Sequence, residues 1–228
     1  MAYIVCAEEI DGHWVAHVPD LPGCFTTHEE REKAIQAVPA AVEEFVTWCG
    51  GHGLRITGLS APMIVSEVIR AWEFEDGHMV HAFFASDRPP LTEEELPEYE
   101  VLLKATMVDL LSVVNDLRSE DEHREFPGEA RTIAGILDHV ARGDLFFLDR
   151  LGLAFSQHEL PEDARASLKK VGDHMLGALP AMMKRSGAMT LAGETWSARK
   201  VLRRSLWHRR DHTFHIGKLC TKIDARQK

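Results

Sequence analysis

The sequence predicts an α+β fold in two parts, an N-terminal sheet-and-helix segment over residues 1–88 and an all-α bundle over 89–228. Short apolar stretches separated by turn residues occupy the first part, which is typical of strands. Long segments with apolar residues at helical spacing occupy the second part, which is typical of amphipathic helices. The stretch Ser86–Thr92, rich in proline and polar residues, reads as the linker between two domains.

The first part is expected to form a small sheet crossed by one helix. The expected strands cover residues 3–9, 13–18, 25–27, 63–72 and 78–84. Two favourable hairpin turns join these strands: Asp11-Gly12 between the first and the second, and Asp76-Gly77 between the fourth and the fifth. A helix is expected over 28–49, and Pro39 inside it should kink the helix because proline lacks a backbone N–H.

The second part is expected to contain four helices. They cover residues 93–118, 131–152, 161–186 and 197–220. Thr132 and Ser197 are suitable N-caps, and Pro161 suits the first turn of a helix. Four long helices joined by loops of medium length predict a helix bundle.

The charge of the chain is unevenly distributed. The net charge is −10, and residues 1–91 contribute −9 of it. An acidic segment repels phosphate backbones and attracts basic proteins, so we expect a basic protein partner for residues 1–88 and no direct nucleic-acid binding.

Neither a membrane span nor export is expected from the sequence. The apolar runs are too short to cross a bilayer, and the first residues lack the basic region of a signal peptide. The four cysteines are widely spaced without a CxxC pair, so we expect free thiols in a cytoplasmic protein.

The last predicted helix carries His208, Asp211, His212 and His215 within about two turns. His208 with His212, and Asp211 with His215, are both spaced i, i+4, which points two side chains to one side of a helix. A third ligand, His139, lies on the second predicted helix. Three protein ligands leave positions for water or substrate, as a catalytic divalent metal requires. Spacing alone does not decide between the two pairs.

A second cluster, the basic run Arg199, Lys200, Arg203 and Arg204, begins the last predicted helix. Such a run is usually a solvated helix face. A functional alternative is that some of these side chains bind substrate carboxylates at the mouth of the bundle.

The N-terminal part resembles the HicB antitoxin family. The resemblance lies in the string Pro19-Asp20-Leu21-Pro22-Gly23-Cys24-Phe25-Thr26, between a hairpin and a helix, and covers about residues 2–50. It implies a partial RNase-H-like fold, a sheet with one helix across it. In place of the DNA-binding module that such antitoxins usually add, this chain has the predicted bundle.

The C-terminal part resembles the DinB superfamily of metal-binding four-helix bundles, which includes bacillithiol S-transferases and the mycothiol-dependent maleylpyruvate isomerase. The matching stretches are Thr132–His139 and Trp196–Arg204, and the resemblance covers about residues 93–222. Aligned on this family, the metal ligands would be His139, Asp211 and His215. The resemblance further implies a divalent ion (Zn, Ni, Fe or Mn) and a homodimer.

Three functions follow from these observations. The DinB resemblance implies a metal-dependent enzyme that transfers or isomerises a small electrophile with a low-molecular-weight thiol; because Asp211 would lessen the charge of the metal site, hydrolysis is a variant. The first alternative is a non-catalytic binding module in which the acidic HicB-like domain docks a basic protein. The second is an antitoxin that acts on DNA, which the negative charge of residues 1–91 disfavours.

Overall fold

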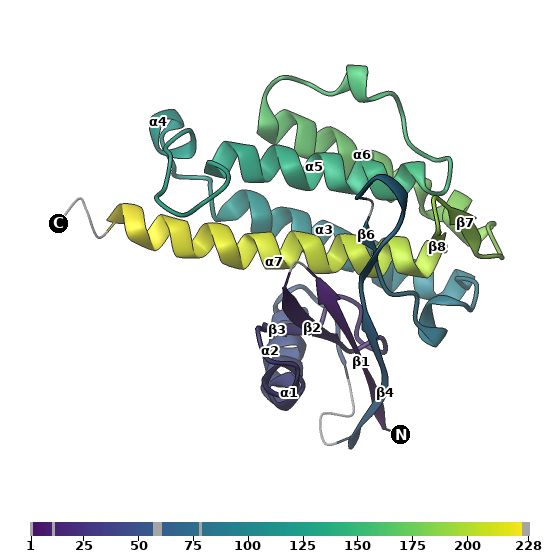
Figure 1. Cartoon of the computed structure of the whole chain (residues 1–228). Helices are drawn as coiled ribbons and strands as arrows, with labels where there is room; N and C mark the ends of the chain where they lie inside the picture. Colours follow the sequence, from purple (N-terminus) through teal and green to yellow (C-terminus); the bar gives the residue numbers. More distant parts are fainter. Residues whose placement is uncertain (1, 11, 57–60, 78, 225–228) are drawn as a thin grey trace. The chain divides into compact units, whose positions relative to one another are not determined.

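The computed structural model is a mixed α+β protein with a four-stranded sheet in its N-terminal part and long helices in its C-terminal part (Figure 1). It describes residues 2–10, 12–56, 61–77 and 79–224. The chain forms two compact units. Unit 1 comprises residues 1–101 and 183–203, and unit 2 comprises residues 102–182 and 204–228.

The sheet of unit 1 has the strand order β3-β2-β1-β4 (Figure 1). Its strands are β1 (Tyr3–Ile10), β2 (His13–His17), β3 (Phe25–His28) and β4 (Met63–Arg70). The pairs β1–β2 and β2–β3 are antiparallel, whereas β4 runs parallel to β1. Gly12 in the predicted first turn has a φ of +79°, which glycine adopts without a steric penalty. Asp11 of that turn lies outside the described residues.

Two helices, α1 (Arg31–Gln36) and α2 (Val38–Gly51), replace the single kinked helix expected over 28–49. They meet at Ala37, which ends α1 and begins α2. Pro39 is the second residue of α2, where its missing N–H removes no helical hydrogen bond. The proline thus starts a new helix, and both helices pack against the same side of the sheet (Figure 1).

Two short hairpins complete unit 1. They consist of β5 (Trp72–Glu73) with β6 (Met79–Val80), and of β7 (Met189–Leu191) with β8 (Glu194–Trp196). The strand expected over 78–84 is thus reduced to two residues, and His78 lies outside the described residues. The β7–β8 hairpin is missing from the sequence prediction. It turns at Ala192 and Gly193, both with positive φ, as in the type I′ turns that suit tight hairpins.

Unit 2 is helical. Its elements are the end of α3 (Leu96–Ser112), α4 (Ser119–Glu122), α5 (Ile133–Asp149), α6 (Ala164–Met183) and most of α7 (Ala198–Asp224). The predicted cap of α5 is confirmed, because Oγ1 of Thr132 accepts a 3.1 Å hydrogen bond from the Gly135 amide. The buried apolar core draws on all four long helices, with Leu110, Leu137, Leu168 and Ile216 as representatives. This core accounts for the periodicity of the predicted bundle segments.

The two compact units differ from the division predicted after residue 88, because α3 and α7 each contribute residues to both units. The first turns of α7 belong to unit 1, where Lys200 and Arg203 are buried in ion pairs with carboxylates of that unit. All four cysteines lie in the described part of the chain, and none is in a disulfide. No helix among the described residues has the length and apolar composition needed to cross a bilayer.

Candidate metal centre

Three histidines converge in unit 2: His139 from α5, and His208 and His212 from α7. The Nε2 atom of His208 lies 3.1 Å from Nε2 of His139 and 3.1 Å from Nε2 of His212. Each ring offers one nitrogen, and the three nitrogens lie within 4.8 Å of one another. Tetrahedral zinc with Zn–N bonds of about 2.0–2.1 Å holds its ligand nitrogens about 3.3 Å apart. The donor set therefore fits a divalent ion in chemistry and in spacing.

Glycine makes room for this cluster on α5. Gly143 lies four residues after His139, on the same side of the helix. A Cβ atom added to Gly143 would lie 2.8 Å from Cε1 and 3.1 Å from Nδ1 of His208. The His208 ring therefore packs directly on the backbone of α5, which a larger residue at position 143 would prevent.

A buried ion pair holds α5 and α7 together next to the histidines. Nε of Arg209 donates to Oδ2 of Asp144 over 2.7 Å, and the hydroxyl of Ser205 donates to Oδ1 over 2.6 Å. Both charged side chains are almost completely inaccessible to solvent. Because buried charges are stable only when well paired, this contact favours one register between α5 and α7. In that register His139 faces His208 and His212.

The electrostatics of the cluster keep the imidazoles of His208 and His212 neutral. Burial lowers the pKa of His208 well below its usual range, and the neighbouring His212 and His139 lower it further. Burial, together with His139 and His215, lowers the pKa of His212 to about 3. Nδ1 of each of these two rings is buried and makes no hydrogen bond to the described part of the protein. Neutral imidazoles offer the lone pairs that a metal ion requires.

Two ligands that the DinB alignment selects, Asp211 and His215, lie on α7 outside this cluster. His215 is half-buried, and its Nε2 lies 2.8 Å from Oε2 of Glu129, whose pKa it lowers through this hydrogen bond. Asp211 is half-buried one residue before His212. Among the residues that the structure describes, neither joins His139 in a group tight enough for one ion. The structure instead groups His139 with the pair His208 and His212, which the spacing in the sequence left equally open.

The basic run at the start of α7 does not form a solvated helix face. Its three members in unit 1, Arg199, Lys200 and Arg203, are each paired with a carboxylate. Arg199 forms a bidentate ion pair with Glu95 and also donates to the carbonyl oxygens of Pro89 and Pro90. Nζ of Lys200 lies 2.7 Å from Oε1 of Glu194, and both side chains are buried.

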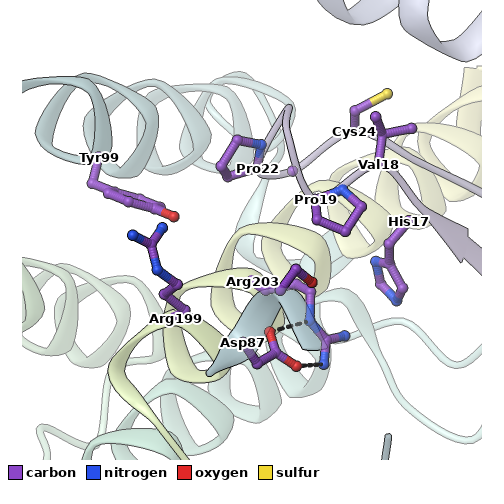
Figure 2. A pocket seen from close by; sticks show the side chains of 11 residues that line it. His17, Val18, Pro19, Pro22, Cys24, Asp87, Tyr99, Arg199 and Arg203 are labelled. Atoms are coloured by element: carbon purple, nitrogen blue, oxygen red, sulfur yellow. Dashed lines mark hydrogen bonds and ion pairs between the residues drawn. The ribbon is translucent and has the colours of Figure 1, made fainter. Parts of the chain in front are cut away.

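Arg203 pairs with Asp87 and with Glu8 at 2.8–3.0 Å. Arg199 and Arg203 line a small pocket next to the loop that begins at Pro19, and Figure 2 shows Tyr99 pointing toward Arg199 there. Since both guanidinium groups are already neutralised by carboxylates, this pocket is a poor site for an anion. The fourth member of the run, Arg204 in unit 2, stacks over the rings of Phe147 and Trp207.

Comparisons of the chain with protein-family models, with curated proteins and with solved structures find no match. The function of the chain is therefore inferred from the chemistry of the site.

Proposed function

We propose that His139, His208 and His212 bind a divalent metal ion and that the chain is a metal-dependent enzyme of the DinB type. The observation that carries this proposal is the convergence of three imidazole nitrogens from two helices, with lowered pKa values for His208 and His212. Three protein ligands leave further positions for a substrate or water. His139 and His212 are half-buried, whereas His208 is buried.

The reaction that fits best is thiol S-transfer or thiol-dependent isomerisation of a small electrophile. A metal ion bound here would act as a Lewis acid and lower the pKa of a coordinated thiol. Three neutral ligands leave the charge of the ion undiminished, whereas Asp211 in the ligand set would reduce it. The all-histidine set thus favours thiol activation over the hydrolytic variant. In this scheme the Asp144–Arg209 ion pair keeps His139 opposite the two α7 ligands.

The DinB and HicB resemblances form part of the proposal. The DinB-like assignment is supported by the long helices and by the origin of the histidines, one from α5 and two from α7. The HicB-like assignment is supported by the small sheet and by the two helices that follow the Pro19–Thr26 string. We expect Zn, Ni, Fe or Mn as the ion, and a low-molecular-weight thiol as cosubstrate.

A second candidate function is a binding module whose acidic N-terminal part docks a basic protein. One observation favours it: Glu43 and Glu44 are exposed on α2 and line a shallow groove with Thr47 and Trp48. Carboxylates beside an indole ring suit a lysine or arginine side chain of a partner. This function does not require a metal.

Metal analysis of the purified full-length chain, before and after exposure to divalent ions, tests the first proposal. We expect close to one ion per chain, lost in His139→Ala, His208→Ala and His212→Ala. Asp211→Ala and His215→Ala are the matched controls on the same helix and should keep the ion. Loss of metal in these two controls, with retention in His208→Ala and His212→Ala, would restore the ligand set of the DinB alignment. A wild-type chain that takes up no metal would leave the binding module as the better explanation.

A further inference from the structure

Arg131 lies on the side of α5 that carries the metal cluster. It directly precedes Thr132, the N-cap of the helix, so its backbone is held by the start of α5. A Cβ atom added to Gly135 would lie 3.4 Å from Cβ and 3.9 Å from Cγ of Arg131. Gly135 is one helical turn before His139, on the same face. The aliphatic stem of Arg131 therefore lies about one turn from a proposed metal ligand.

The guanidinium group of Arg131 is exposed and makes no ion pair or hydrogen bond to any residue that the structure describes. By contrast, Arg142 of the same helix pairs with Asp138, and Arg209 of α7 pairs with Asp144. Arg131 is thus an uncommitted cation beside the three histidines.

The carboxylate nearest to Arg131 in the sequence is already engaged. Oε2 of Glu129 lies 2.8 Å from Nε2 of His215, and Oε1 lies 3.4 Å from Nζ of Lys222. The three-histidine cluster itself contains no carboxylate. A carboxylate of a bound molecule would therefore pair with Arg131 without breaking an ion pair of Glu129.

We propose that Arg131 binds a carboxylate of the small thiol or electrophile whose donor atom occupies an open position of the metal centre. This inference rests on the proposed function. A guanidinium group suits this role because its planar fork binds a carboxylate through two parallel hydrogen bonds. Arg131 would thus act as a specificity-determining residue that selects anionic over neutral ligands.

The test uses full-length protein loaded with Co²⁺, whose absorption spectrum reports thiolate coordination directly. The probes are mercaptoacetate, which carries a carboxylate, and 2-mercaptoethanol, which does not. We expect the wild type to bind mercaptoacetate more tightly, and Arg131→Gln to lose about tenfold in this preference, which corresponds to about 1.4 kcal/mol. Arg131→Lys should keep part of the preference, because it retains the charge without the fork.

Lys218→Gln is the matched control. It removes the same charge from an exposed position on α7, more than one turn beyond His212. This variant should behave like the wild type. An unchanged preference in Arg131→Gln, an equal loss in Lys218→Gln, or a wild type without any preference would overturn the role of Arg131 while leaving the metal site intact. Failure of the wild type to bind Co²⁺ at all would instead refute the proposed function, and this inference with it.

Discussion

The ring of His208 on α7 packs directly on the backbone of Gly143 on α5, four residues after His139. A Cβ atom at position 143 would lie only 2.8 Å from Cε1 of His208. This close approach lets Nε2 of His208 reach 3.1 Å from Nε2 of His139. Because Gly143 has no side chain, the imidazole of His208 on α7 can approach that of His139 on α5 this closely.

We predict that Gly143→Ala weakens metal binding by at least about tenfold, because the new methyl group displaces the His208 ring and misplaced ligands lose affinity. Titration of metal-free protein with Zn²⁺ in competition with a chelator measures this loss. Gly177→Ala is the control, since a Cβ atom there meets nothing within 4 Å. Gly177→Ala should leave zinc affinity unchanged and stabilise the protein by about 0.5–1 kcal/mol. Equal zinc affinity in the two variants would contradict this role of Gly143.

The buried ion pair of Asp144 and Arg209 should dominate the electrostatic stability of unit 2. Asp144→Ala leaves the guanidinium of Arg209 buried without its partner, which we expect to lower the free energy of unfolding by about 3–5 kcal/mol. Asp138→Ala, on the same helix, breaks a solvent-exposed pair with Arg142 and should cost no more than about 0.5 kcal/mol. Urea denaturation of both variants measures the difference. Similar losses for the two would show that burial does not set the strength of this pair.

The metal-free protein should lose stability as the pH falls below about 6.5. His212 and His208 have lowered pKa values in the folded chain, to about 3 for His212, so the unfolded chain binds protons first. Their contribution is complete above pH 6.5 and is lost as the pH falls toward 3, with a limiting slope of about 1.4 kcal/mol per pH unit for each histidine.

Urea denaturation of chelator-treated protein across this pH range checks the expectation. His212→Gln removes one titrating group and should flatten the decline. His158→Gln changes an exposed histidine of unit 2 and should leave it unchanged. A decline that is identical in His212→Gln and in the wild type would refute the assignment of this pH dependence to the cluster.

The β7–β8 hairpin should depend on Gly193 for two separate reasons. Gly193 has a φ of +73°, and a Cβ atom there would lie 2.7 Å from the ring of Phe74. Gly53 has a similar φ of +83° but open space around it. Gly53→Ala should therefore cost only the backbone strain of about 1–2 kcal/mol, whereas Gly193→Ala should cost a further 1–3 kcal/mol, roughly, for overpacking. Thermal unfolding of both variants measures the two effects, and equal losses would argue against the contact with Phe74.

Several parts of the fold could be predicted from the sequence because they depend on local physics. The hairpin around Gly12 and the cap of α5 by Thr132 each follow from the backbone preferences of one or two residues. At Pro39 the sequence predicts only a kink in one helix, whereas the chain begins a second helix, α2, one residue earlier. The β7–β8 hairpin escaped prediction because its strands have three residues each, too few for a recognisable alternation.

The candidate metal centre shows where local information ends. Helical spacing alone determined that α7 would present two i, i+4 ligand pairs and that His139 was available on another helix. Which pair faces His139 depends on the rotation of α7 about its axis. That rotation is set by tertiary contacts, chiefly the buried Asp144–Arg209 ion pair and the space left by Gly143. These contacts join residues more than 60 positions apart, so only the folded chain could select His208 and His212 over Asp211 and His215.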